Sequence, residues 1–333
     1  MKRESTLEDV AARAGVSRAT ASRVINGSPR VTDATRKAVQ RAVKALRYTP
    51  NRAARSLAGS SSDTVALVVS EPADRMFADP YFAGTVRGVA AALGETRYQL
   101  VLLAIHGDDD RRRVERHLLQ GTTDGVLLLS ARADDPLPGR LVKEGLPCVI
   151  AGRPEDAAVG YVDADNEGGA REAVEHLLAR GRQVIATVAG PADMAVGAHR
   201  YEGWRSALVD AGHQAPRTLA ARSDFTRAGG AAAAARLLER TPKIDAVFAA
   251  SDLMALGVLD ALRAGGRAVP GDVAVVGFDD SELAVSADPP LTSVRQPIEQ
   301  MGREMAAALL AQLGGAPATG VVLPTELVVR RSS

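Results

Sequence analysis

Residues 6–27 read TLEDVAARAGVSRATASRVING and predict two short helices joined by a tight turn. Thr6 is a good helix N-cap, and Asp9 stands three residues later, where an acidic side chain completes a capping box. Apolar residues then recur at helical spacing up to Gly15, which suits the left-handed conformation that ends a helix. Ser17 is a good N-cap for the second helix. These local signals predict two helices and the turn between them.

A third, longer helix is predicted to begin after Thr32 and to end before Tyr48, with a buried side made of Ala34, Ala38, Val39, Ala42, Val43 and Leu46. Two short helices with a glycine turn, braced by a longer third helix, form the helix-turn-helix arrangement. Its second helix lies in the major groove of DNA. The outward face of that helix offers Ser17, Arg18, Ala19, Ser22 and Arg23, while Thr20 either faces inward or braces the backbone.

The charge of the chain is unevenly distributed. Residues 1–60 carry 13 Lys and Arg against 4 Asp and Glu, a net charge of +9. Residues 61–333 carry 28 against 36, a net charge of −8, so the whole chain has a net charge of +1. A basic head on an acidic body indicates a polyanionic partner for the head alone. Arginine-rich helices also occur as solvated surfaces, so the motif decides between the two interpretations.

Over residues 6–59 the sequence closely resembles the lactose/galactose repressor (LacI–GalR) family of bacterial transcription factors. The resemblance rests on VAARAGVSRATASRVINGSPRVTDATRKAV followed by YTPNRAARSLAG. It implies a ligand-responsive, sequence-specific regulator, a repressor of a carbohydrate uptake or catabolic operon, which binds a pseudo-palindromic DNA operator as a homodimer. It also implies that Arg18, Ala19 and Arg23 read bases, as arginine forks do on guanine. The residues placed for phosphate contacts are Thr6, Ser17, Asn26 and Thr35.

The segment NRAARSLAG at 51–59 resembles the hinge helix of that family. So short a helix is unstable alone, which fits folding on DNA. Leu57 is predicted to be a wedge in the minor groove, Asn51 and Arg55 to contact the DNA backbone or groove, and Arg52 to contact a phosphate. The alternative is an ordinary linker that contains one incidental leucine. The predicted domains are a head at 1–49, a hinge and linker at 50–62 and a body at 63–333.

From residue 63 onward, the sequence predicts buried parallel strands that alternate with helices. The strands are predicted at 64–70, 100–105, 125–130, 147–151, 184–189, 246–250 and 273–278, and the helices at 81–94, 109–120, 167–180, 198–211, 226–240, 252–264 and 297–313. This alternation predicts an α/β body of parallel sheets covered by helices on both faces. The body resembles periplasmic sugar-binding proteins, which implies two lobes with a ligand cleft between them. We expect lobe 1 at about 63–162 plus 292–322, and lobe 2 at about 163–291 plus 323–333.

Candidate effector-binding residues follow strand ends or lie in loops, where ligands bind in such sheets. The chain has only 11 aromatic residues, and aromatic faces with a few polar groups are typical of small-molecule sites. The candidates are Tyr81, Phe82, Arg153, Asp165, Asn166, Arg200, Phe225, Ser251 and Asp279. By the resemblance, Arg200 and Asp279 are the strongest, whereas Asp252 and Asp280 are read as helix-terminal charges. Met194 stands where the purine repressor has an effector-binding arginine, which argues against a purine, and Trp204 is assigned to the core.

The remaining features bear on the function classes. The five His residues show neither a catalytic nor a metal-ligand spacing, and the glycines form no nucleotide-binding motif, so we expect no enzyme, no cofactor and no metal. The chain shows no signal peptide or membrane span, and its one cysteine, Cys148, has no partner, which together favour the cytoplasm. A regulator in the bacterial cytoplasm, at the nucleoid when DNA-bound, is the first interpretation. The alternative is a sugar-binding protein without a DNA function.

Overall fold

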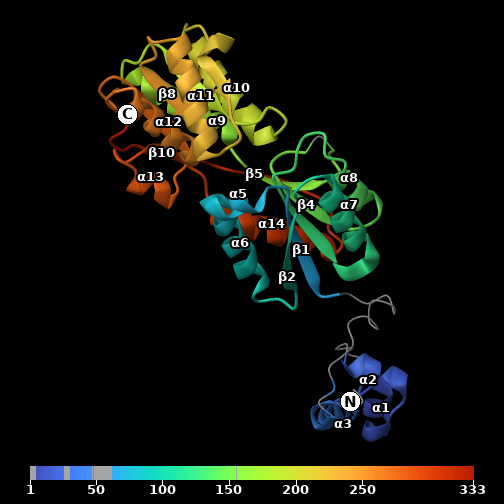
Figure 1. The fold of residues 1–333 in the computed structure, drawn as a ribbon. Coiled ribbons are helices and arrows are strands. Elements are labelled where there is room, and N and C mark those ends of the chain that lie inside the picture. Colours follow the sequence, from blue (N-terminus) through green and yellow to red (C-terminus); the bar gives the residue numbers. More distant parts are fainter. Residues whose placement is uncertain (1–4, 26–30, 47, 49–61, 155) are drawn as a thin grey trace. The chain divides into compact units, whose positions relative to one another are not determined.

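The chain divides into two compact units, Met1–Ser62 and Asp63–Ser333. The computed structural model describes residues 5–25, 31–46, 48, 62–154 and 156–333 (Figure 1). The first unit contains helices α1 (Leu7–Ala14), α2 (Arg18–Ile25) and α3 (Asp33–Leu46). All three helices begin and end close to the predicted positions, and they share one small core of Val10, Val24, Val39 and Ala42.

The predicted helix ends of the head are confirmed. The Thr6 hydroxyl accepts a hydrogen bond from the Asp9 amide at 3.3 Å, and the Asp9 carboxylate accepts one from the Thr6 amide at 2.8 Å. Gly15 ends α1 with φ of 67°, a conformation that costs a glycine nothing. Ala34 is exposed, although it was predicted to be buried, because the buried side of α3 begins one turn later.

The body contains two six-stranded sheets, one in each lobe. The first sheet is parallel throughout and has the order β11-β5-β4-β3-β1-β2. Its strands are β1 (Thr64–Val69), β2 (Gln99–Ala104), β3 (Gly125–Leu129), β4 (Cys148–Ala151), β5 (Gly160–Ala164) and β11 (Gly320–Leu323). Strand β2 was predicted to be fully buried, but it is an edge strand and Leu102 is exposed on it.

The second sheet has the order β12-β10-β9-β8-β6-β7 and is parallel except for β12, which runs antiparallel to β10. Its strands are β6 (Ile185–Ala189), β7 (Ala220–Arg222), β8 (Ala246–Ala249), β9 (Ala274–Asp279), β10 (Thr292–Arg295) and β12 (Glu326–Val328). The chain therefore passes between the lobes three times, after β5, after β10 and between β11 and β12.

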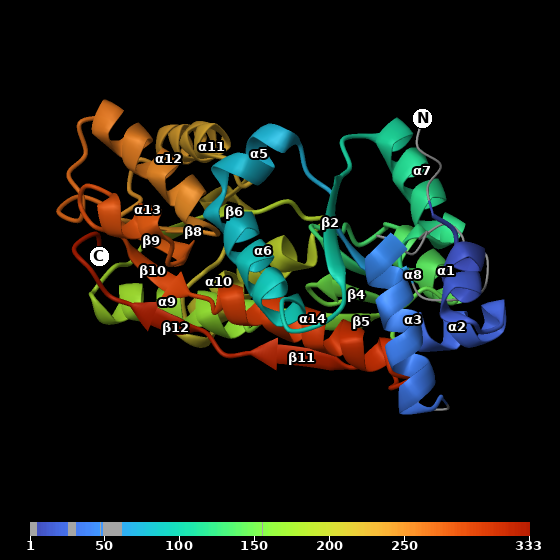
Figure 2. The ribbon, with the colours of Figure 1, turned by 90° about the horizontal axis from the view of Figure 1, so that it is seen from below.

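Helices cover both faces of each sheet, as Figure 2 shows from a second direction. They are α5 (Ala73–Ala78), α6 (Pro80–Leu93), α7 (Asp108–His117), α8 (Leu137–Lys143), α9 (Asn166–Ala179), α10 (Ala195–Asp210), α11 (Arg227–Arg240), α12 (Asp252–Ala264), α13 (Glu282–Ser286) and α14 (Ile298–Leu313). In β1, Val65, Leu67 and Val69 join the core on one face of the sheet and Ala66 and Val68 the core on the other. This alternation explains why the strands are apolar runs.

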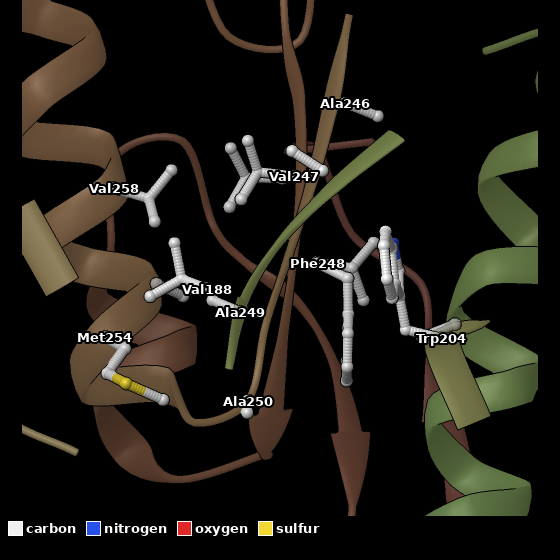
Figure 3. Packing of buried hydrophobic residues seen from close by; sticks show 14 of the residues in the cluster. Val188, Trp204, Ala246, Val247, Phe248, Ala249, Ala250, Met254 and Val258 are labelled. Carbon is white, nitrogen blue, oxygen red and sulfur yellow. The ribbon is translucent and has the colours of Figure 1, made fainter. Parts of the chain in front are cut away.

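The core of the second lobe centres on three large aromatic side chains that are fully buried, Trp204, Phe248 and Phe278. Figure 3 shows the indole of Trp204, from α10, beside the ring of Phe248, from β8. The indole Nε1 donates a hydrogen bond to the Ile185 carbonyl at 3.2 Å, which satisfies its one polar group. The assignment of Trp204 to the core is confirmed.

Two of the predicted lobe boundaries are wrong by two residues or more. Strand β10, at 292–295, pairs with β9 in the second sheet, so the segment that returns to the first lobe begins after it, at Gln296, instead of at residue 292. Strand β5 runs to Ala164 in the first sheet, two residues beyond the predicted boundary. Both errors fall on short strands that were not predicted from the sequence.

Candidate functional site

The outward face of α2 carries the predicted DNA-reading side chains. Ser17, Arg18, Ala19 and Arg23 are exposed, while Thr20 and Ser22 are half-buried. The Ser17 hydroxyl accepts a hydrogen bond from the Thr20 amide at 3.2 Å and therefore caps α2. Arg18 pairs with Glu8 at 3.0 Å, but both side chains are largely exposed, so the pair is weak and leaves the guanidinium accessible.

Of two further predicted phosphate contacts, Thr6 is the N-cap of α1 and Thr35 lies in the first turn of α3. The Thr35 amide donates to the Thr32 hydroxyl at 3.3 Å, and Thr6 caps α1, so both lie near helix N-termini, where amide groups favour an anion. The other predicted DNA contacts lie outside the described residues, namely Asn26, Asn51, Arg52, Arg55 and Leu57.

If Arg23 reads a base as predicted, Arg23→Ala should weaken operator binding by about 1–3 kcal/mol and relax the preference at one base pair of each half-site, because the guanidinium fork is lost. Arg41→Ala, on the exposed side of α3, is the matched control. It should leave the sequence preference unchanged. Binding titrations against operators with single base changes measure both. A loss from Arg23→Ala that is equal for every sequence would contradict the reading role.

One cavity of about 800 Å³ lies between the two lobes of the body. Eight of the nine candidate effector residues line it, and they come from both lobes: Tyr81, Phe82, Arg153, Asn166, Arg200, Phe225, Ser251 and Asp279. The ninth, Asp165, does not line the cavity. Its carboxylate accepts the Gly168 amide at 3.0 Å and caps α9, so its role is structural.

Arg200 and Asp279 form the polar centre of this cavity. Arg200, on α10, is only 3% exposed, and its Nη1 lies 3.3 Å from Oδ1 of Asp279, at the end of β9. Its Nε donates to the Asn166 side chain at 2.8 Å, and Nη1 donates to the Ala250 carbonyl at 2.6 Å. The guanidinium carbon lies 3.6 Å from the centroid of the Phe278 ring. These contacts hold the guanidinium rigidly in place.

The carboxylate of Asp279 is equally constrained. Gln296 Nε2 donates to its Oδ1 at 2.6 Å, the same oxygen that faces Arg200. The contacts with Arg200 and Gln296 both involve Oδ1 of Asp279, and neither of them uses its other carboxylate oxygen, Oδ2. Burial raises the pKa of Asp279 well above its usual value, and the positive charge of Arg200 opposes this rise. Asp279 also has φ of 111°, so the local backbone is strained to hold the side chain there.

The first lobe contributes aromatic and acidic groups. Asp79 caps α6 by accepting the Tyr81 amide at 3.0 Å, and burial raises its pKa. The rings of Tyr81 and Phe82 meet edge to face, with centroids 5.3 Å apart. Burial also raises the pKa of the Tyr81 hydroxyl, which stays protonated and can donate a hydrogen bond.

Sequence reasoning missed several lining residues, of which Asp163 is the clearest. It is the next-to-last residue of β5, and its Oδ2 is buried without a hydrogen-bond partner among the described residues. Arg153 Nε and His199 Nδ1 lie 3.5 Å and 3.9 Å from that oxygen. Burial raises the pKa of Asp163. The signal that could have found it is its place at the carboxyl end of a strand, but β5 was not predicted.

A network behind the cavity supports the turn after β9. Asp252 Oδ2 accepts the Ser281 amide at 2.8 Å, and its Oδ1 accepts the Ser293 hydroxyl at 2.6 Å. Asp280 pairs with Arg295 at 2.8 Å and with Arg330 at 2.5 Å. Neither Asp252 nor Asp280 lines the cavity, in agreement with a structural role for both.

The lobes also touch at the rim of the cavity. The Ala133 amide, which follows β3, donates to the Asp193 carbonyl at 2.8 Å, and Arg132 pairs with the Asp193 carboxylate.

Within the described part of the chain, no group of three or more His, Cys, Asp and Glu side chains is placed to hold a metal ion. No described helix has both the length and the apolarity needed to cross a membrane.

Two family models match the chain. One, described as bacterial regulatory proteins of the lacI family, matches residues 6–51, and the other, a periplasmic binding protein-like domain, matches residues 174–333. The chain is 52% identical over 336 residues to the HTH-type transcriptional regulator CelR of Thermobifida fusca, and the match covers 99% of each protein.

Two solved structures extend the comparison over the whole chain. A transcriptional regulator CelR–cellobiose complex superimposes with a TM-score of 0.80 at 50% identity, covering 99% of this chain and 100% of that one. The lac repressor dimer bound to operator and the anti-inducer ONPF superimposes with a TM-score of 0.82 at 28% identity, covering 99% of each chain.

Proposed function

Because the chain belongs to the lacI family of bacterial regulatory proteins, we propose that this DNA-binding regulator of transcription responds to a saccharide bound between the two lobes of its body. The observation that supports the proposal most strongly is the convergence of Arg200 and Asp279 in one interlobe cavity. A carboxylate that accepts and a guanidinium that donates suit the neighbouring hydroxyls of a sugar.

The size and lining of the cavity favour a disaccharide. Its volume of about 800 Å³ lies toward the upper end of the usual range for small-molecule sites. Tyr81, Phe82 and Phe225 supply apolar ring faces, and Asp163 supplies a buried carboxylate oxygen that can accept from a hydroxyl. The similarity to the CelR–cellobiose complex makes cellobiose the first ligand to test.

The regulator acts as a homodimer in this proposal, since one head supplies a single recognition helix and a pseudo-palindromic operator presents two half-sites. Ligand binding changes how the two lobes close, and through the hinge at 50–62 it changes operator affinity. A ligand shifts this equilibrium only by its differential affinity for the two states.

The target is a carbohydrate uptake or catabolic operon, and the chain acts at the nucleoid in the cytoplasm. The known members of the family are regulators, and no catalytic role is proposed for this chain.

Isothermal titration calorimetry of the full chain with cellobiose, lactose and glucose tests the ligand class. We expect cellobiose to bind with one site per chain and glucose to bind more weakly, because a single ring fills less of the cavity. A chain that binds none of these saccharides, while it still binds DNA, would overturn the saccharide assignment. A chain that binds saccharides but no DNA would instead support the alternative of a plain sugar-binding protein.

A further inference from the structure

Arg75 connects the two lobes at one wall of the cavity. It lies on α5 in the first lobe, lines the cavity, and is 13% exposed at its side chain. Its guanidinium carbon lies 5.9 Å from the ring centroid of Phe82, in the same lobe, and 5.1 Å from that of Phe225, in the other. Its Nη1 pairs with the buried carboxylate of Glu71. The cation is thus held by two aromatic rings and one acid.

One donor of this guanidinium is left over. The Nε of Arg75 is shielded from solvent and has no hydrogen-bond partner among the described residues. The Nε of Arg200, by contrast, donates to Asn166. A buried N–H without an acceptor is costly, and such groups in native proteins call for an explanation. Because Arg75 lines the cavity, a small rotation of its guanidinium toward the cavity would bring this donor to an acceptor on a bound ligand.

The aromatic surface that Arg75 meets in the second lobe is fixed in place. Phe225 has φ of 64°, an unusual backbone conformation for a bulky residue. Its ring packs directly over Gly190, where an added Cβ would come within 2.3 Å of the ring. The position of the Phe225 ring therefore depends on the second lobe, and Arg75 reaches it only when the lobes are close together.

We propose that Arg75 is a specificity-determining residue of the effector site, whose Nε donates a hydrogen bond to one hydroxyl oxygen of the saccharide. Because its guanidinium lies near Phe82 of one lobe and Phe225 of the other, ligand binding at Arg75 is coupled to the contact between the two lobes. This inference rests on the proposed saccharide function and adds a residue that neither the sequence nor the Arg200–Asp279 centre suggested. It also predicts that Arg75 recognises one particular hydroxyl group of the saccharide.

Calorimetry of Arg75→Met with cellobiose and with its monodeoxy analogues tests the proposal. Methionine keeps an unbranched side chain and removes the charge and the donor. We expect cellobiose affinity to fall about 10- to 100-fold, as for loss of a hydrogen bond from a charged group. One monodeoxy analogue, which lacks the acceptor, should bind the wild type and the variant nearly equally. Arg75→Lys should recover little of the affinity, since an ammonium does not reproduce the planar fork.

Arg97→Met is the matched control, because Arg97 also stacks on an aromatic ring, that of Tyr98, and pairs with an acid, but lies outside the cavity. It should leave cellobiose affinity unchanged. Thermal unfolding and operator binding without ligand show whether Arg75→Met remains folded. An equal loss for cellobiose and every deoxy analogue would overturn the ligand contact and leave only a structural role. Wild-type affinity in Arg75→Met would overturn it too, whereas failure of the wild type to bind any saccharide would remove the proposed function itself.

Discussion

Asp279→Asn is expected to weaken cellobiose binding by about 100-fold or more and to remove the response of operator binding to the sugar. The amide keeps the size of the carboxylate, and asparagine tolerates a positive φ better than most residues do. It cannot accept hydrogen bonds from Arg200, Gln296 and a ligand hydroxyl together, because one of its two terminal atoms is a donor. Calorimetry gives the affinity, and operator titration with and without cellobiose gives the response.

Asp260→Asn is the control for this experiment. Asp260 is also paired with an arginine, Arg227, at 2.6 Å, but it lies on α12 outside the cavity. It should bind cellobiose as the wild type does. Asp279→Asn should still bind operator without ligand, since the head is unchanged. If Asp279→Asn responds at the same cellobiose concentrations as the wild type, the effector binds elsewhere.

Trp204→Ala is expected to cost about 3–5 kcal/mol in the free energy of unfolding of the body. Trp204 is fully buried beside Phe248, so truncation leaves a cavity and also removes the donor to the Ile185 carbonyl. At about 2–4 °C for each kcal/mol in a unit of this size, the melting temperature should fall by roughly 10 °C. Urea and thermal unfolding of the wild type and the variant measure the change.

Trp204→Phe separates the two contributions. It keeps much of the apolar volume and loses the indole donor, so it should cost less than Trp204→Ala. Arg41→Ala, in the separate first unit, should leave the stability of the body unchanged. A loss below about 1 kcal/mol for Trp204→Ala would show that the second lobe does not depend on this packing.

The head could be predicted almost completely because its signals are local. Thr6, Gly15 and Ser17 each specify a helix end within a few residues of themselves. In the body, the long apolar strands were predicted, whereas short ones such as β7 and β10 were not. The sequence TSVR of β10 has no apolar run, and only its pairing with β9 places it in the second lobe. Such pairing is a long-range property that periodicity does not report.

The same difference between local and long-range signals explains which residues of the candidate site could be predicted. Aromatic residues and the Arg200 and Asp279 motifs stand out in the sequence, and the cavity brings them together. Arg75 and Asp163 have no such local signal. Arg75 is placed by two aromatic rings that are far apart in the sequence, and Asp163 lies on a strand that was not predicted. The sequence predicts Asp165 as a site residue, but its carboxylate caps the helix that follows it.

The central claim is that saccharide binding between the lobes controls operator binding by the head. The most direct measurement is the operator affinity of the full chain, at one salt concentration, with and without saturating cellobiose. Coupling between two such sites is typically worth a factor of about 5–150, and cellobiose affinity must change by the same factor when operator is bound. We predict a change in this range, equal in both directions. Cellobiose that binds the body and leaves operator affinity unchanged would contradict the account.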